Sequence, residues 1–234
     1  MVSKQDVSRA SKELSELIPK LDVDAVGVVN LDDVKGSKLE ESVRRLLPEA
    51  RSVVVFAMEV YPEVLDNTQP GRTTGMASMN DLLACHTEYL SGRLTRTAYD
   101  VAKASRKLGM KALPLPATGC PYDTRFLEAV FSYKHAAEAA GMGYLGRSSL
   151  LVTPDFGPRV RLSCCLTEVP LASTPGAVNK VCEGCDICIE NCPAGALESP
   201  QADESYAINR FACSIFGSAS GGCSECMRLC PSGH

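Results

Sequence analysis

The chain has 234 residues, with 24 Lys and Arg against 28 Asp and Glu, 45% hydrophobic residues and 12 cysteines. This length allows one or two domains with a sizeable core, and the balance of charged and apolar residues excludes a disordered tail, a collagen-like chain and a basic nucleic-acid arm. The cysteine content is the unusual property.

The first 60 residues predict a helix, a strand, a second helix and a second strand. Apolar residues recur at helical spacing over Ser3–Leu17, whose first residue is a candidate N-cap. Val-rich runs at Ala25–Val29 and Ser52–Met58 predict buried strands. The segment Leu39–Leu47 between them predicts a helix that Pro48 ends. We therefore expect a β-α-β start.

The following hundred residues predict two further helices and three strands. Leucines and alanines recur on one face from about Asn80 to Leu108, where Gly109 provides a stop. Arg125–Ala140 has a similar periodicity and ends at Gly141. Lys111–Leu115, Leu150–Thr153 and Arg159–Leu166 predict strands. The predicted fold class is mixed α/β (α+β), with a sheet of about five strands.

The N-terminal residues contain charged side chains such as Lys4, Asp6 and Arg9 and no apolar stretch of the signal-peptide kind. The longest wholly apolar run of the first half, Val53–Met58, is far shorter than the ~18 residues that suggest a membrane span. We therefore expect a cytoplasmic protein in a reducing compartment. There, cysteines at short regular spacing indicate metal ligands rather than disulfides.

Eight of the 12 cysteines fall in the last 53 residues. Residues 182–193 follow the two-cluster bacterial ferredoxin spacing, C-x2-C-x2-C-x3-C-P, and residues 223–231 carry a second, irregular run, C-x2-C-x3-C-P, preceded by Cys213. In such runs the last cysteine binds the other cluster. We therefore predict a first cluster set of Cys182, Cys185, Cys188 and Cys230. The second cluster set is Cys192, Cys213, Cys223 and Cys226.

Two alternatives concern the cysteines. Two Cys-x-x-Cys pairs could instead hold tetrahedral zinc, but zinc requires neither the third cysteine at the same spacing nor the proline after each run. The remaining cysteines are predicted to be buried thiols, because free Cys is among the most buried residue types. They are Cys85, Cys120, Cys164 and Cys165.

Charge changes at the same place as cysteine content. Residues 171–234 hold seven acidic and three basic residues, so the whole net charge of −4 falls there and residues 1–170 are balanced. A turn-rich stretch at 172–176 separates the two parts. We therefore predict one domain over residues 1–171 and a second over residues 172–234.

The segment Gly141–Gly146 matches the Gly-x-Gly-x-x-Gly dinucleotide fingerprint. That motif has meaning where it follows a strand and opens a helix, whereas here it follows a predicted helix. We therefore expect no NAD site. The glycines let the backbone turn tightly or approach a flat ligand closely.

Several motifs in a linked order resemble the core of the epoxyqueuosine reductase family and its relatives, the reductive dehalogenases. They are SYKHAAEAAGMGYLGRSSLL at 132–151, GPRVRL at 157–162, LTEVPL at 166–171 and, for the first core strand, LPEARSVVV at 47–55. In that family a two-cluster ferredoxin module with an irregular second motif follows. The resemblance covers most of residues 45–234.

The resemblance implies a nitroreductase-like domain that binds cobalamin, or alternatively FMN, followed by a ferredoxin-like domain with two 4Fe–4S clusters that feed electrons to the cofactor. The cofactor would carry the difficult chemistry on a small substrate. The glycine loop is the candidate cofactor-binding segment, and its alternative is a helix-to-strand turn with packing glycines. The candidate residues are Gly141, Gly143, Tyr144, Gly146, Arg147, Ser148 and Ser149.

The catalytic Asp of epoxyqueuosine reductases has no clear counterpart here, because the matching place falls at Leu127–Glu128. Tyr133 and Lys134 are the candidate catalytic residues. A phenol can donate a proton, and a neighbouring Lys lowers its pKa by favouring phenolate. The alternative is an exposed Tyr and a solvated Lys on a helix surface.

The expected partners are an external electron donor such as ferredoxin or flavodoxin and a small-molecule substrate, without a membrane. A tRNA substrate is not expected, because the sequence ends three residues after Pro231 and its acidic balance disfavours phosphate binding. An electron-transfer protein that serves a partner enzyme is the competing function, since an acidic domain steers towards a basic partner. The third possible function is a reductase that reactivates the corrinoid of another protein.

Overall fold

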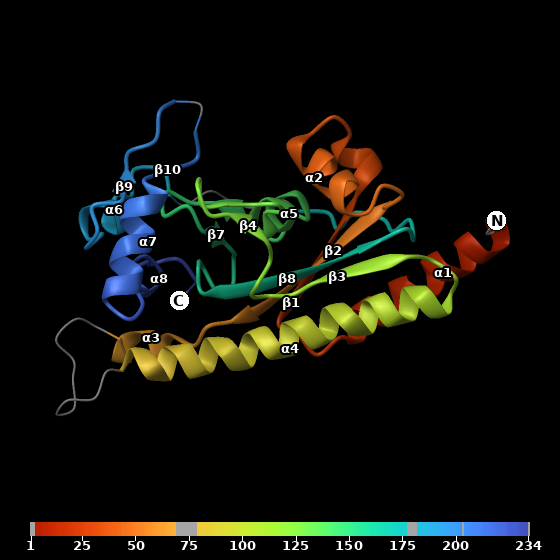
Figure 1. Ribbon diagram of the computed structural model, residues 1–234, viewed down its shortest axis with the longest axis horizontal. Coiled ribbons are helices and arrows are strands. Elements are labelled where there is room, and N and C mark those ends of the chain that lie inside the picture. Colours follow the sequence, from red (N-terminus) through yellow and green to blue (C-terminus); the bar gives the residue numbers. More distant parts are fainter. Residues whose placement is uncertain (1–2, 69–78, 177–181, 203, 234) are drawn as a thin grey trace. The chain divides into compact units, whose positions relative to one another are not determined.

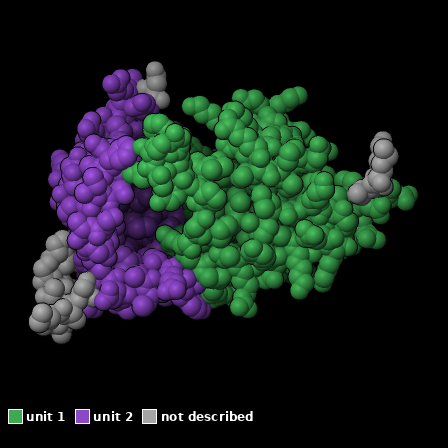
Figure 2. All heavy atoms as spheres, in the orientation of Figure 1, with its two compact units in different colours: residues 1–58, 91–142, 161–177 green, residues 59–90, 143–160, 178–234 purple. Residues whose placement is uncertain are grey.

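The computed structural model describes residues 3–68, 79–176, 182–202 and 204–233. Packing divides the chain into two compact units, which Figure 2 shows in different colours. Unit 1 comprises residues 1–58, 91–142 and 161–177, and unit 2 comprises residues 59–90, 143–160 and 178–234. Each unit takes three separate segments of sequence. The predicted functional division between residues 171 and 172 stays a prediction.

The largest sheet has four strands in the order β1-β2-β8-β3 (Figure 1). They are β1 (Ala25–Asn30), β2 (Ser52–Glu59), β8 (Val160–Thr167) and β3 (Ala112–Leu115). β1 pairs with β2, and β3 with β8, in antiparallel register. The β-α-β order is therefore confirmed, with α2 (Lys38–Leu46) between the first strands, but the adjacent strands do not run parallel.

The prediction of about five strands in one sheet is wrong. β7 (Leu151–Val152) instead pairs with β6 (Tyr144–Leu145) in a separate two-stranded sheet of unit 2. This separate pairing has a local cause. The backbone of Gly143, the residue before β6, lies directly against the carbonyl of Val152 on β7. The glycine loop therefore provides the partner strand that β7 needs.

The core of unit 1 lies on the central strand β2, where residues 52–58 are all buried. A strand buried along its whole length has a continuous apolar sequence rather than an alternating one. α1 (Lys4–Leu17) contributes buried Ala10 and Leu14, while α4 (Asn80–Lys107), the longest helix in Figure 1, contributes Leu94 and Ala98. The two short 3-10 helices are η1 (Ile18–Lys20) and η2 (Leu31–Val34).

The N-terminus of α1 is closed by a capping box around Ser3, the residue that the sequence predicts as N-cap. The Ser3 hydroxyl accepts from the Asp6 backbone N–H, and the Asp6 carboxylate accepts from the Ser3 backbone N–H. Ser3→Ala should lower the free energy of unfolding by about 1 kcal/mol, measured by urea denaturation. Ser42→Ala is the control, because the Ser42 hydroxyl only donates to a carbonyl inside α2. Equal effects of the two changes would contradict the capping role.

The helix predicted over Arg125–Ala140 is half wrong, because α5 comprises only Tyr133–Ala139. The preceding residues form a hairpin of β4 (Tyr122–Asp123) and β5 (Glu128–Ala129). The Asp123 carboxylate accepts hydrogen bonds from the backbone and the guanidinium of Arg125, which closes the turn and competes with helix formation. The predicted end is confirmed, since Gly141 has a φ of 70°.

The described elements of unit 2 are short. Its helices include α3 (Pro62–Asn67), α6 (Ile187–Glu190), α7 (Arg210–Ala219) and α8 (Glu225–Arg228), and β9 (Leu197–Glu198) pairs with β10 (Ala207–Ile208). α6, α7 and α8 contain no buried residue. Apolar burial therefore contributes little to these helices. Across the described part of the chain, no helix is long and apolar enough to cross a bilayer.

Candidate functional site

The cysteines of the first cluster set act on one another electrostatically. Burial, followed by the charges of three other cysteines, raises the pKa of the Cys188 thiol to about 11. Those three are Cys182, Cys185 and Cys230. They are the other members of the first cluster set, including the one from the distant second run. Folding therefore brings all three within electrostatic reach of Cys188.

The second cluster set behaves in the same way. Burial and then four other cysteines raise the pKa of the Cys226 thiol to about 12. Three of them, Cys223, Cys213 and Cys192, are the other members of the second cluster set. The fourth, Cys188, belongs to the first cluster set, so the two sets lie within electrostatic reach of each other. The ligand roles themselves stay a prediction.

The chemistry of these donors fits iron–sulfur clusters. Thiolates gathered in this way repel one another, and iron cations relieve that repulsion because cysteine binds metal as thiolate. Within the described residues, no three His, Cys, Asp or Glu side chains form a site for one metal ion. A 4Fe–4S cube, with an iron at each thiolate, spaces its ligands more widely than a tetrahedral zinc does. Metal binding would also stabilise the helices α6, α7 and α8, which contain no fully buried residue.

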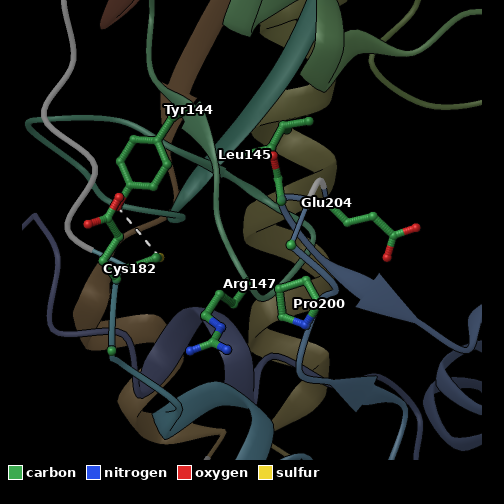
Figure 3. Close-up of a pocket in the computed structure, with 10 residues that line it drawn as sticks. Tyr144, Leu145, Arg147, Cys182, Pro200 and Glu204 are labelled. Atoms are coloured by element: carbon green, nitrogen blue, oxygen red, sulfur yellow. Dashed lines mark hydrogen bonds between the residues drawn. The ribbon is translucent and has the colours of Figure 1, made fainter.

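The glycine loop packs against the first cysteine of this region. The Tyr144 side chain is 4% exposed, and its hydroxyl donates to the Cys182 sulfur at 3.6 Å (Figure 3). A Cβ added at Gly146 would lie 3.1 Å from the same sulfur, and one at Gly143 would lie 2.3 Å from the Val152 carbonyl oxygen. Gly143 and Gly146 are therefore glycines because neighbouring atoms of the chain leave no room for a Cβ. This agrees with the alternative interpretation of the loop as a turn with packing glycines.

The other candidate cofactor-binding residues also make internal contacts or are buried. Arg147 forms an ion pair with Asp186 at 2.7 Å and donates to the Cys185 carbonyl at 3.5 Å, which holds the cysteine loop. Ser148 and Ser149 are both buried. Gly141 lies in unit 1, where an added Cβ would meet the backbone of Gly176 at 2.6 Å.

A cavity of about 400 Å³ lies between the glycine loop and the cysteine loop within unit 2. Tyr144, Leu145 and Arg147 of the glycine loop line it together with Cys182, Pro200 and Glu204 (Figure 3). This volume is at the lower end of the range for small-molecule sites, ~300–1,000 Å³. The described residues therefore fit a small substrate, or one edge of a larger ring such as a corrinoid, and do not enclose a whole corrinoid.

The candidate catalytic residues lie in unit 1, at the start of α5. The Tyr133 hydroxyl donates to the Pro116 carbonyl at 2.6 Å. Burial, followed by a hydrogen bond with Cys120, raises the pKa of Tyr133, so the expected lowering by Lys134 is wrong. The phenol is thereby kept protonated, and the catalytic assignment of Tyr133 and Lys134 stays a prediction.

The raised pKa of Tyr133 predicts a stability loss in alkali. Its folded pKa lies above the ordinary value of ~10, so the unfolded state loses its proton first as pH rises. This contribution to stability is complete below about pH 10 and is lost above it. Between about pH 9 and about pH 11, urea denaturation should show a smaller stability loss for Tyr133→Phe than for the wild type. Exposed Tyr99 provides the control variant Tyr99→Phe, and equal slopes in all three proteins would contradict the prediction.

The four remaining cysteines divide in a way that the sequence does not predict. Cys164 and Cys165 on β8 are fully buried, as expected, and burial raises the pKa of Cys165 to about 12. Cys120 is half-buried and Cys85 is exposed on α4, so the prediction for Cys85 is wrong. Because Cys85 lies in a stretch of α4 with exposed neighbours, helical periodicity alone does not place it inside.

Arg159, which the sequence does not mark as a functional residue, is 1% exposed. It directly precedes β8 and belongs to unit 2. Its guanidinium donates to three backbone carbonyls of the C-terminal segment, at Cys230, Ser232 and Gly233. The sequence signal is an Arg directly before a mostly apolar strand.

Comparison with known proteins relates this fold to a class of reductases. The structure of epoxyqueuosine reductase with a tRNA-Tyr stem loop has a TM-score of 0.60 at 20% identity, covering 97% of this chain and 66% of that one. A catabolic reductive dehalogenase has a TM-score of 0.71 at 16% identity, covering 94% and 31%. The fold is therefore the mixed α/β fold of these reductases.

Sequence similarity gives the relationship. The chain is 28% identical over 205 residues to a tetrachloroethene reductive dehalogenase of Desulfitobacterium hafniense, covering 77% of this chain and 32% of the relative. It is 22% identical over 259 aligned positions to the epoxyqueuosine reductase of Bacillus subtilis, covering 97% and 64%. The chain is homologous to epoxyqueuosine reductases and reductive dehalogenases over most of its own length, but spans only part of theirs. No protein-family model matches it.

Proposed function

We propose that the chain is an iron–sulfur oxidoreductase in which two 4Fe–4S clusters pass electrons, one at a time, to a corrinoid that reduces a small substrate. The observation that carries the proposal is the contact between Tyr144 of the glycine loop and Cys182 of the first cluster set, beside the cavity. An electron at the first cluster would thus be next to the bound molecule. One related solved structure is described by its B12-dependent dehalogenation mechanism.

Exposure of the cysteines supports a direction for electron flow. Cys213 and Cys223 of the second cluster set are exposed, whereas all four cysteines of the first cluster set are partly buried. Electrons from an external donor such as ferredoxin or flavodoxin would enter at the second cluster and leave at the first. The net charge of −4 over residues 171–234 would steer a partner with a basic docking surface.

The chain's own residues position and tune this path. The Tyr144 hydroxyl donates to the Cys182 sulfur, and hydrogen bonds to cluster sulfurs favour the reduced cluster. The Arg147–Asp186 ion pair fixes the cysteine loop against the glycine loop. A bound corrinoid supplies the reductive cobalt chemistry, and Tyr144, Leu145 and Glu204 are the residues that would meet its edge. Tyr133 is the proposed proton donor, since a phenol can supply a proton.

A second candidate function is electron transfer to a corrinoid or flavin carried by a partner enzyme. It is favoured by the cavity, which admits one edge of a corrinoid without enclosing it. The polar side chains of Tyr144 and Arg147 are also engaged within the chain rather than free for corrinoid amides. In this case the cavity would be the exit for electrons and not a binding site for a whole cofactor.

Anaerobic titration separates these functions. The protein, reconstituted with iron and sulfide, is titrated with hydroxocobalamin and separately with FMN while its visible spectrum is recorded. Saturable binding of hydroxocobalamin at one per chain supports the bound corrinoid. Ala202→Trp, which fills the cavity, should weaken that binding, while Ala219→Trp at the exposed end of α7 should not. No binding of either cofactor would overturn the first function and favour the second.

A further inference from the structure

Arg159 is a buried cation fixed by the backbone of the C-terminal segment. Its Nη1 donates to the Cys230 carbonyl at 3.2 Å, and its Nη2 donates to the carbonyls of Ser232 at 2.7 Å and Gly233 at 2.5 Å. Three carbonyl oxygens hold the guanidinium in one place. They supply partial negative charge only, so they orient the cation without neutralising it.

The described residues offer Arg159 no carboxylate partner, since none of the ion pairs they form includes it. Its Nε is buried without a hydrogen-bond partner among these residues. Arginine keeps its proton in proteins, so burial cannot be relieved by neutralising the side chain. A buried charge is unfavourable unless an opposite charge compensates it. A nearby anion would therefore stabilise this buried cation.

The nearby source of negative charge is the first cluster set. Burial raises the pKa of the Cys230 thiol, while the charge of Arg159 acts on that thiol in the opposite direction. Arg159 is thus within electrostatic reach of a predicted cluster ligand. A 4Fe–4S cluster held by four thiolates carries net negative charge and gains one further negative charge on reduction, and net charge is one of the factors that set its potential.

Backbone packing keeps this distance fixed. A Cβ added at Gly157, two residues before Arg159, would lie 2.1 Å from the Ser232 carbonyl oxygen. A Cβ added at Gly233 would lie 2.1 Å from the Gly157 nitrogen. The turn before Arg159 and the segment after Cys230 are therefore in direct backbone contact. The cation cannot move away from Cys230 without breaking that contact.

We infer that Arg159 is the counter-ion of the first cluster, stabilising its reduced form and raising its reduction potential relative to the second cluster. The inference rests on the cluster part of the proposed function. The step concerned is addition of one electron from an external reductant to the oxidised cluster, with no bond formed or broken and no proton taken up. Arg159 is a positioning residue, since it acts through the cluster ligands.

The test is an anaerobic redox titration of the full chain, reduced with dithionite and followed by electron paramagnetic resonance. In Arg159→Gln, the ratio of reduced to oxidised first cluster at a fixed potential should fall by about tenfold, which is ~59 mV for one electron. Arg159→Lys keeps the charge. In this variant the ratio of reduced to oxidised first cluster should fall by no more than about threefold, which is ~30 mV by the same conversion. The second cluster of the same molecules should change little in either variant.

Arg161→Gln is the matched control. Arg161 lies on β8, and its Nη2 donates to Ser91 Oγ. Its Nε, like that of Arg159, is buried without a hydrogen-bond partner among the described residues. Its replacement removes a positive charge two residues further along the chain and should leave the first cluster unchanged. An unchanged first cluster in Arg159→Gln, or an equal shift in Arg161→Gln, would overturn the inference.

Three further outcomes are decided by the same samples. If Arg159→Gln does not assemble the first cluster, the Lys variant decides, because a tenfold fall with the charge retained would overturn a role for charge. If the wild type assembles no 4Fe–4S cluster, the proposed function fails and the inference with it. If it assembles two clusters and the variants shift neither, only the inference fails.

Discussion

Replacing Cys230 by serine should remove the same cluster as replacing Cys182, although the two cysteines lie at opposite ends of the cysteine-rich segment. Cys192→Ser, only four positions beyond Cys188, should remove the other cluster. The expected iron content falls from ~8 to ~4 per chain in each single variant. The reason is that the charges of Cys182 and Cys230 act on the same thiol, that of Cys188.

Double variants distinguish cysteines of the same cluster from cysteines of different clusters. Cys182→Ser with Cys230→Ser should retain the ~4 iron of either single variant, whereas Cys182→Ser with Cys192→Ser should lose both clusters. Iron and acid-labile sulfide analysis and the electron paramagnetic resonance of the reduced proteins measure the outcome. Cys85→Ser is the control, because Cys85 is an exposed thiol outside both sets. Loss of one and the same cluster from Cys188→Ser and Cys192→Ser would show that the assignment is wrong.

Gly157→Ala should both destabilise the protein and detach the C-terminal segment that holds Cys230. Gly157 has a φ of 56°, a region that costs an L-residue ~1–2 kcal/mol. The added Cβ would also lie 2.1 Å from the Ser232 carbonyl oxygen, which is backbone and cannot rotate away. The backbone contact must therefore open. We expect a loss of at least ~2 kcal/mol in the free energy of unfolding, together with selective loss of the first cluster.

Gly36→Ala separates backbone strain from this contact. Gly36 has a φ of 79°, but a Cβ there meets no atom within 4 Å. Its substitution should cost only the ~1–2 kcal/mol of the left-handed conformation and leave both clusters intact. Urea denaturation and iron content measure the two effects on the same samples. Equal destabilisation by the two substitutions, with both clusters retained, would contradict the role of Gly157.

Much of the fold follows from local sequence. Ser3 as N-cap, the Val-rich run of β2 and the stop of α4 before Gly109 are all confirmed, since capping, burial and left-handed glycine each depend on a few neighbouring residues. The shortened α5 shows the limit, because apolar periodicity from Arg125 onward is overridden by a hairpin that the Asp123 side chain closes.

The sequence by itself determined which cysteines are candidate cluster ligands and how they divide into two sets, because ferredoxin spacing is a local geometric constraint. Only the tertiary structure decided that Tyr144 donates to the Cys182 sulfur, and that Arg159 is buried against the carbonyl of Cys230. Both contacts join segments that are far apart along the chain. Such contacts arise from the packing of whole elements, which leaves no mark in the spacing of neighbouring residues.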